Sequence, residues 1–550
     1  MRQWWRSGSP WIWLNGGAVA ISMVMVFGLL VLILVRGFGT FWPHAVLETR
    51  YAAPGTEPVR VVGELRRSET LTAQVLRDAG VAIPQDQSFV TRHLIKTGNR
   101  DVTGRDFVYF LDDFMDEWRY PESITVLERR EWGDFYGEPL RLLEQEQVIA
   151  QGAELWPEFM QRLKRSDRIF DEIRAIERGA IGDVNYSMER VRLDRRRAQL
   201  RDNLTPEYQQ ALEARRAALD AEYAVLKTRL DSLYADVRRD SIVMRAANDR
   251  EVTIRLADIV KAWQPNNMSV AAKVGQYAGN FFDFIFGYPR EANTEGGIFP
   301  AIFGTVTMVL VMSIMVAPFG VLAAIYLREY ARQGPLLKAI RISVYNLAGV
   351  PSIVFGVFGL GFFVYFVGGG IDRTFYPEAL PAPTFGTPGL FWASLTLALL
   401  TLPVVIVSTE EGLARIPSTI RQGSLALGAT KGETLWKVVV PLATPAMMTG
   451  LILAIARAAG EVAPLMLVGV VKLAPTLPID GNFPFVHLER KIMHLGFHIY
   501  DVGFQSPNAE AAEALVYATA LILVLLIVLL NLSAITIRNR LRERYRSESD

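Results

Sequence analysis

Six long apolar stretches decide what this sequence can fold into. A bilayer core about 30 Å thick requires roughly 20 apolar residues of helix, because no water is present there to pair with free backbone groups. The stretches that reach this length cover residues 17–36, 298–326, 342–368, 389–408, 445–470 and 514–537. The sequence therefore predicts an all-α membrane domain with six transmembrane helices, of which residues 1–37 supply the first and residues 298–537 the rest.

The first stretch has two interpretations. Arg2 and Arg6 precede an apolar run, as in a cleaved secretory signal, but the run reaches Val35 without a small-residue cleavage site. Tryptophans flank it at interfacial depths, namely Trp4, Trp5, Trp11, Trp13 and Trp42. We therefore expect a retained transmembrane anchor, and a cleaved signal is the alternative.

Lysine and arginine are concentrated in alternate loops, which sets the expected orientation. Basic residues in short loops near membrane spans favour the cytoplasm. They gather at residues 2–6, 328–341, 415–437 and 538–546. Six alternating spans put all four groups on one side, so we expect a multi-pass protein of a bacterial inner membrane with a cytoplasmic N-terminus and a basic cytoplasmic tail over 538–550. The segments expected in the periplasm are 38–297, 370–388 and 472–512.

Composition and motifs exclude several classes of function. The 58 basic and 57 acidic residues nearly balance, so there is no overall electrostatic case for a nucleic-acid partner. Cysteine is absent, and the five histidines do not cluster at metal-ligand spacings. The run nearest to a Walker A motif, Gly428–Thr434, lacks the Gly-Lys pair that contacts phosphate. We therefore expect a protein that is not an enzyme and that binds no cofactor itself.

The long segment between the first two spans mixes two kinds of sequence. Residues 50–140 hold short alternating stretches between Gly and Pro breaks, which predicts a small sheet. The alternation is clearest at Val59–Leu65, Phe107–Leu111 and Ile124–Leu127. Residues 141–247 are rich in Leu, Glu, Arg, Ala and Gln, a mixture typical of long helices. We expect a mixed α/β periplasmic insert over 38–297.

A seven-residue repeat runs through the helical part of the insert. The leucines of the repeat are Leu212, Leu219, Leu226 and Leu233, and Tyr223, Leu230 and Val237 each lie four residues beyond one of them. Thr205 followed by Pro206 is typical of a helix N-cap and a first helical residue. The chain is therefore expected to turn near Asn203 and to form a coiled-coil hairpin. The hairpin is either a solvated scaffold or a docking surface for a partner protein.

The expected cytoplasmic loop over 409–445 is long, polar and compatible with helices. Its spacing resembles the coupling signature of bacterial ABC importer permeases, which is E-A-A, three residues, Gly, nine residues and I-x-L-P. The matching positions are Gln422, Gly423, Ser424, Gly428, Val438, Val440 and Pro441. The resemblance implies two short helices in a groove of an ATP-binding subunit, with contacts from Glu410, Glu411, Arg421, Gln422, Gly428 and Pro441. Because Gln422 replaces the family's Glu, the contact is expected to depend on shape more than on that ion pair.

Three further stretches narrow the resemblance. Residues 454–467 read AIARAAGEVAPLML, residues 289–305 read PREANTEGGIFPAIFGT, and residues 346–363 read NLAGVPSIVFGVFGLGFF. They are similar to the A permease subunits of phosphate-specific ABC transporters. The resemblance implies the type I ABC importer fold and passage of inorganic phosphate into the cytoplasm. It also implies three kinds of partner: a homologous permease subunit, two ATP-binding subunits that use the ATP, and a periplasmic phosphate-binding protein.

Charged residues in the fifth stretch are candidates for the substrate pathway. Arg457 and Glu461 lie four residues apart, and charges inside an apolar span normally face a cavity or each other. One hypothesis is that the pair is self-neutralising and locks helix packing. The other is that Arg457 offers its planar guanidinium to a phosphate oxyanion while Glu461 holds it. Ser352, after the break at Pro351, either relieves a kink or donates to phosphate.

The same residues leave three alternative functions to compare. Arginine geometry does not separate phosphate from sulfate, so a permease for another oxyanion is the nearest alternative. An envelope scaffold that the spans merely anchor would have no need of Arg457 and Glu461 inside a span. A transporter driven by an ion gradient is expected to show inverted repeats, and none is detected in the sequence.

Overall fold

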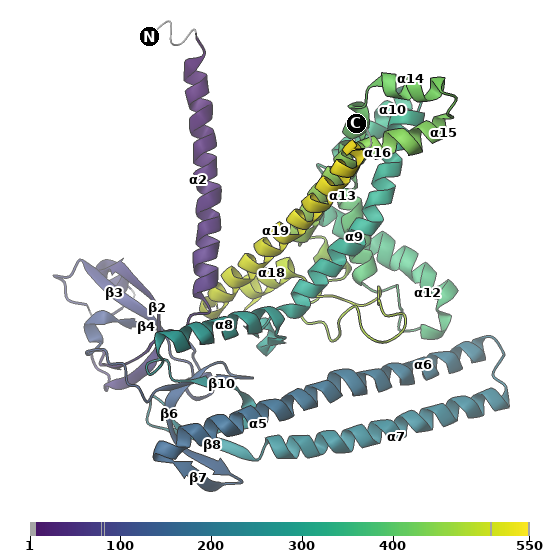
Figure 1. The fold of residues 1–550 in the computed structure, drawn as a ribbon. Coiled ribbons are helices and arrows are strands. Elements are labelled where there is room, and N and C mark those ends of the chain that lie inside the picture. Colours follow the sequence, from purple (N-terminus) through teal and green to yellow (C-terminus); the bar gives the residue numbers. More distant parts are fainter. Residues whose placement is uncertain (1–6, 79, 82, 507–508, 548–550) are drawn as a thin grey trace. The chain divides into compact units, whose positions relative to one another are not determined.

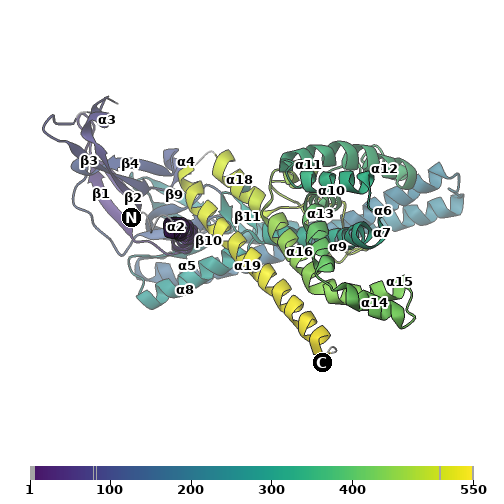
Figure 2. The ribbon, with the colours of Figure 1, turned by 90° about the horizontal axis from the view of Figure 1, so that it is seen from above.

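Long apolar helices form one part of the fold and antiparallel sheets form the other. The computed structural model describes residues 7–547 apart from residues 79, 82, 507 and 508. The first part, here called the membrane unit, combines Met1–Thr40 with Ile298–Asp550, and the second, the insert unit, is Phe41–Gly297. Figures 1 and 2 show both in two views. Arg2, Trp4, Trp5 and Arg6, which supported the prediction for the first span, lie outside the described residues.

The membrane unit contains the six apolar helices that the sequence predicts. Within the described residues, the segments long and apolar enough to cross a bilayer are Trp11–Gly39, Phe299–Tyr330, Ser352–Phe375, Leu390–Ala414, Lys431–Gly460 and Ala512–Arg540. Their helices are α2 (Ser9–Gly39), α9 (Phe299–Ile325), α11 (Ser352–Phe358), α12 (Gly369–Phe375), α13 (Leu390–Ala414), α15 (Lys431–Thr434), α16 (Val440–Gly460) and α19 (Ala509–Ser547), with π-helical segments at Tyr326–Tyr330, Gly359–Gly368 and Leu435–Val439. Shorter helices are α10 (Pro335–Leu347), α14 (Ser418–Ala426), α17 (Leu465–Val468) and α18 (Leu495–Gln505).

The start of the third span and the end of the fifth each differ by ten residues from the predicted limits, and backbone chemistry explains both differences. The third begins at Ser352 rather than at residue 342, because Pro351 restricts the residue before it and leaves α10 as a separate helix. The fifth ends at Gly460 rather than at residue 470. Glu461 is extended there, and Pro464 follows without a backbone N–H. Arg457 and Glu461 therefore lie at the end of this span. The sequence had placed them near its middle, and that prediction is wrong.

The helices α9, α13 and α16 pack around the buried core of the membrane unit and lie close together in both views (Figure 1, Figure 2). Its side chains include Met308, Met312, Leu397, Leu400, Ala454 and Ala458. Small residues allow the close approach: a Cβ added at Gly450 would lie 2.7 Å from the Cβ of Ser408. Because lipid provides no hydrophobic force between helices, such close backbone packing is what holds spans together.

The loop between the fifth and sixth spans packs tightly against the start of α9. The backbone N–H of Leu495 donates to Thr305 Oγ1 at 3.0 Å, and that hydroxyl donates to the carbonyl oxygen of Ala301 at 2.7 Å. Gly304 lies so close to the carbonyl oxygen of Met493 that a Cβ there would overlap it. The loop is thus fixed to the second span by a contact that only glycine permits.

The insert unit contains two antiparallel sheets. The first has the order β1-β2-β3-β4, and the second has the order β10-β5-β6-β8-β9 with β7 paired to β6. The strands are β1 (Val46–Tyr51), β2 (Val59–Thr72), β3 (Phe89–Lys96), β4 (Phe107–Leu111), β5 (Thr125–Arg129), β6 (Phe135–Glu144), β7 (Gln147–Gln151), β8 (Asp240–Arg245), β9 (Glu251–Arg255) and β10 (Ile259–Trp263), with a small hairpin of β11 (Pro289–Arg290) and β12 (Glu295–Gly296). Of the three stretches predicted from alternation, Val59–Leu65 lies within β2, Phe107–Leu111 is β4, and Ile124–Leu127 overlaps β5.

A long helical hairpin projects from the second sheet. It consists of α5 (Leu155–Ala175), a π-helical segment (Ile176–Ala180), α6 (Ile181–Leu200) and α7 (Pro206–Val237), and shorter helices of the unit are α3 (Ala73–Asp78), α4 (Arg100–Thr103) and α8 (Val270–Phe286). Thr205 caps α7 as predicted, because its side chain accepts from the backbone N–H of Tyr208. α6 and α7 lie side by side (Figure 1), with Val191 on α6 and Leu212 on α7 buried.

The hairpin occupies less sequence than the predicted range of 141–247. Residues 141–151 belong to β6 and β7, although their composition is typical of helix. Gln145 and Glu146 both adopt positive φ angles, 45° and 70°, and form the tight turn between these strands. Beyond α7, β8 returns to the sheet beside β6, and the helical part ends at Val237.

Replacing Gly304 by alanine tests the contact between the fifth-to-sixth loop and α9. We expect Gly304→Ala to lower stability by about 1–3 kcal/mol, because the new methyl group overlaps the carbonyl oxygen of Met493. Thermal unfolding of the purified protein measures the effect. The control is Gly361→Ala, at a helical glycine with nothing within 4 Å of the added Cβ. Equal unfolding midpoints for the two variants would contradict the prediction.

Candidate functional site

Two short helices lie within the predicted 409–445 segment: α14, which follows the fourth span, and α15, which begins the fifth. They lie side by side and project beyond the end of α16 (Figure 2). Between them Gly428 has φ +91°, a conformation that side chains with a Cβ rarely adopt. Thr430 then caps α15: its hydroxyl accepts from the N–H of Glu433 at 3.2 Å, and the Glu433 carboxylate accepts from the N–H of Thr430 at 3.0 Å.

Glu329, at the end of the second span, anchors both short helices. Its carboxylate accepts from Arg421 Nη2 of α14 at 2.9 Å, and its carbonyl oxygen accepts from Lys431 Nζ of α15 at 2.6 Å. Arg421 also donates to the carbonyl oxygens of Ile416 at 2.7 Å and Leu413 at 2.8 Å. The two helices are therefore tied to the ends of the second and fourth spans, through a residue that the sequence did not single out.

The predicted contact residues of this segment divide into two groups. Glu410 pairs with Arg341 at 2.5 Å, as Arg421 pairs with Glu329, so these two charges hold the segment together from inside. Pro441, the second residue of α16, is half-buried. Glu411, Gln422 and Gly428 are exposed. Only the exposed group is free to touch another protein.

Apolar side chains are exposed around the bend between α14 and α15. Leu427, next to Gly428, is 91% exposed. Ile420, Leu425 and Trp436 are exposed as well. Leucine and tryptophan are depleted from ordinary wet surfaces, and apolar clusters on a soluble surface indicate an interaction site. The sequence signature drew attention to the polar and glycine positions and missed these four residues.

Arg457 and Glu461 form an ion pair at the C-terminal end of α16. Arg457 Nε donates to Glu461 Oε1 at 3.4 Å, and the two side chains are 35% and 20% exposed. In the part of the chain that the structure describes, the terminal nitrogens of Arg457 make no further hydrogen bond. Ser352 is the half-buried first residue of α11, on a different helix from Arg457. The structure thus brings two of the three predicted pathway residues together.

A buried polar group on α18 could not be predicted from sequence spacing. His494, the N-cap of α18, accepts from the backbone N–H of Gly496 at 3.1 Å, and its other ring nitrogen is buried without a partner. Both ring nitrogens of His498 are also buried, and neither has a hydrogen-bond partner among the residues that the structure describes. Burial lowers the pKa of each histidine to about 4, with Asp501 opposing and Lys472 adding to the effect at His498. Both rings are therefore neutral at pH 7 and do not attract anions as charges.

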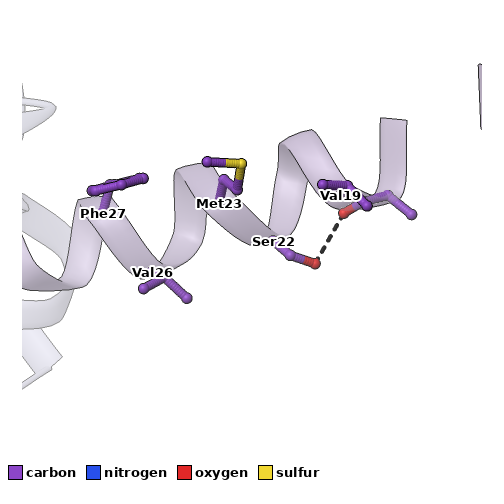
Figure 3. A pocket seen from close by; sticks show the side chains of 6 residues that line it. Val19, Ser22, Met23, Val26 and Phe27 are labelled. Carbon is purple, nitrogen blue, oxygen red and sulfur yellow. Dashed lines mark hydrogen bonds between the residues drawn. The ribbon is translucent and has the colours of Figure 1, made fainter. Parts of the chain in front are cut away.

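A shallow hollow on α2 carries no anion-binding group. It is lined by Ala18, Val19, Ser22, Met23, Val26 and Phe27 (Figure 3). The hydroxyl of Ser22 donates to the carbonyl oxygen of Ala18 at 2.9 Å, so its proton is used within the helix. This surface suits lipid or another apolar helix and is not a candidate for the substrate pathway.

Comparison with known proteins decides the family. Residues 316–547 match the family described as the binding-protein-dependent transport system inner membrane component. The phosphate transport system permease protein PstA of Mycobacterium leprae is 35% identical over 276 residues, which cover 49% of this chain and 81% of that protein. The chain belongs to the PstA family of permeases.

Other members of this family are found in distant organisms. PstA 1 of Mycobacterium tuberculosis is 34% identical over 245 residues, covering 44% of this chain and 71% of that protein. A probable PstA of Methanocaldococcus jannaschii is 28% identical, covering 42% and 72%. Among solved structures, the inward-facing MetNI methionine ABC transporter aligns with a TM-score of 0.33 and 19% identity, over 44% of this chain and 94% of that chain. The membrane unit is the six-helix transmembrane part of an ABC importer permease, and Phe41–Gly297 is an additional mixed α/β insert.

The buried histidines predict a loss of stability in acid. Each has a pKa near 4 when folded and near 6.5 when unfolded, so stability is complete above pH 6.5 and falls as the pH drops from 6.5 towards 4. The loss is up to about 3 kcal/mol for each histidine. We expect His498→Gln to reduce the fall in unfolding midpoint between pH 7.5 and pH 5, measured by thermal unfolding. An unchanged fall would show that His498 is not buried as a neutral ring.

Proposed function

We propose that this chain is the A-type permease subunit of an ATP-driven importer that carries inorganic phosphate across the inner membrane into the cytoplasm. The observation that carries the proposal is the identity of 35% to a phosphate transport permease over 81% of that protein. The six apolar helices and the short-helix segment between the fourth and fifth agree with such a subunit. A permease for another oxyanion is the second candidate, because an arginine fork does not separate phosphate from sulfate.

The orientation and partners follow from this proposal. The basic group around α14 and α15 faces the cytoplasm, as do both termini, and the insert faces the periplasm. The working complex contains a homologous permease subunit, two ATP-binding subunits that hydrolyse the ATP, and a periplasmic phosphate-binding protein. This chain binds no cofactor and supplies no ATPase site of its own.

In the proposed mechanism, α14 and α15 transmit the motion of the ATP-binding subunits. The exposed side chains at the bend, Leu427 foremost, enter a groove of the ATP-binding subunit. Because Glu329 is bonded to both Arg421 and Lys431, a push on the bend reaches the second span as well as the fourth and fifth. Packed helices that move as rigid bodies then open the pathway to one side of the membrane at a time.

The substrate pathway is proposed to include Arg457. Arg457 donates its Nε hydrogen to Glu461, so the two terminal nitrogens of its guanidinium can donate to an oxyanion. Two such parallel hydrogen bonds are the geometry in which arginine binds phosphate bidentately. Ser352 is proposed as a hydroxyl donor on the same pathway. The competing proposal is that the ion pair only secures the end of α16.

The helical hairpin is proposed to be a coiled coil that extends from the insert as a periplasmic scaffold. Its charged outer surface agrees with a solvated structure, and docking of a partner protein is the second candidate for its role. Removal of residues 155–237, joined by a short Gly-Ser linker, distinguishes them. Transport at the wild-type rate would exclude a docking role that transport requires.

Uptake of labelled phosphate tests the function as a whole. In a strain that lacks this chain, we expect the chain to restore uptake with an active ATP-binding subunit and to fail with a catalytically dead one. Sulfate uptake measured in parallel separates the two oxyanions. Uptake that persists with the dead ATP-binding subunit would refute the proposal.

Leu427→Asp tests the coupling surface. We expect at least about tenfold weaker binding to the ATP-binding subunit, because burying an unpaired carboxylate costs more than about 1.4 kcal/mol. Phosphate-dependent ATPase activity in proteoliposomes should fall, while the unfolding midpoint stays constant because Leu427 is exposed. Leu473→Asp, also at an exposed leucine but in the loop between the fifth and sixth spans, is the matched control. Equal losses for both variants would contradict the assignment.

Arg457→Lys and Arg457→Gln test the substrate role. Lysine keeps the charge but loses the fork, so we expect the KM for phosphate to rise at least about tenfold, and glutamine should raise it further. Arg373→Lys, at an exposed arginine that donates to its own helix, is the control. If both Arg457 variants transport normally, the substrate role is wrong. If only their unfolding midpoints fall, the pair is a packing lock.

A further inference from the structure

The helix α8 of the insert unit presents an apolar stripe to the outside, while its other side holds both polar and aromatic residues against the protein. A helix on the surface of a water-soluble domain does the opposite. The large exposed apolar residues of α8, Val270, Val274, Phe282 and Phe286, lie with Ala278 at every fourth position. Val270 and Phe286 are 74% and 63% exposed. Such an outward apolar stripe requires an apolar occupant.

The opposite side of α8 is bonded to the insert unit through polar groups. Asn280 accepts from Lys261 Nζ of β10 at 3.0 Å and donates to the carbonyl oxygen of Phe41 at 3.3 Å. Gln276 donates to Asn280 at 3.0 Å, and Asp283 pairs with Lys261. This network fixes the rotation of α8, so the apolar stripe cannot turn inward without breaking it.

Phe41 connects α8 to the membrane exit of the first span. Its ring packs against Phe284 and Phe281 of α8, with centroids 5.1 and 5.4 Å apart. Phe41 follows the last residue of α2, Gly39, by two residues, which is at most about 7 Å of chain. α8 is therefore held within a side chain's reach of the point where the chain leaves the bilayer.

Two aromatic residues that carry a polar group, Trp42 and Tyr277, lie near the point where the chain leaves the first span. The ring of Trp42 lies tilted at 51° against that of Tyr277 of α8, with centroids 6.1 Å apart, and Trp42 is 38% exposed. Tryptophan and tyrosine concentrate at headgroup depth in membrane proteins, because their rings are apolar and their N–H and O–H groups are not. α8 itself carries one basic and one acidic residue, Lys273 and Asp283. Its net charge of zero favours no particular lipid charge.

We propose that α8 lies flat in the outer interface of the bilayer, with the stripe from Val270 to Phe286 inserted at the boundary between headgroups and acyl chains. The occupant is the lipid surface itself, bound by apolar burial without a requirement for anionic lipid. The insert then has three attachments to the membrane: the first span, the second span and α8. This proposal goes beyond phosphate transport and does not depend on the substrate.

Single cysteines in the full-length chain test the proposal, since the native chain has none. Ala278→Cys and Ala272→Cys replace the same exposed residue type about 120° apart around one helix. Val274→Cys is a second position on the stripe. Each is labelled with a polarity-sensitive fluorophore and reconstituted into nanodiscs of zwitterionic lipid that carries a nitroxide quencher near the headgroup or at the chain end.

We expect the headgroup-proximal nitroxide to quench the labels at 278 and 274 at least about twofold more than the label at 272. The headgroup-proximal nitroxide should also quench the labels at 278 and 274 more than the chain-end nitroxide does. Aqueous iodide should quench the label at 272 more than the labels at 278 and 274. Iodide quenching of all three labels alike would overturn the proposal, because the stripe would then face water. Protection of 278 and 274 from both lipid and aqueous quenchers would also overturn it, because a protein would then cover the stripe.

Discussion

Close approach of α9, α13 and α16 is the interaction on which the membrane unit depends. In a bilayer, the apolar side chains gain nothing by leaving lipid for one another, so the helices stay together only where their backbones come near enough for dense contact. Gly450 of α16 against Ser408 of α13 is such a place, and Gly304 of α9 makes the same kind of close contact with the loop residue Met493. A methyl group at Gly450 would push α13 and α16 apart, and one at Gly304 would displace the loop that carries Met493.

The apolar lengths predicted the number and type of the spans, because a bilayer allows few other folds for such sequences. Their limits were less predictable, since hydropathy does not measure the backbone geometry of Pro351, which precedes α11, or of the extended Glu461, which follows α16. In the insert, the residues around Gln145 have helical composition, but a two-residue turn with positive φ makes them a β-hairpin. α8 was missed because its apolar residues make a stripe and not a continuous run.

The candidate site, too, was predictable from the sequence only in part. The spacing around Gly428 located a segment between the fourth and fifth spans that forms two short helices with that glycine between them. It could not reveal that Arg421 and Glu410 are engaged internally, because their partners Glu329 and Arg341 belong to other helices far away in the sequence. Nor could it reveal that Leu427 is exposed. Pairings between distant segments and the direction of a side chain at a bend are properties of the folded chain.

The register of β6 and β8 has a consequence for how this protein varies. The helical hairpin leaves after the end of β7 and returns into β8, and both of these strands pair with the same residues of β6, one on each edge. The hairpin is therefore an extended connection between the two strands that flank β6, and each of them is held in the sheet by its own pairing with β6. Insertions or deletions of whole helical turns in α6 and α7 leave every strand pairing unchanged. Related chains can thus differ greatly in length at this point while the remainder of the insert stays superimposable.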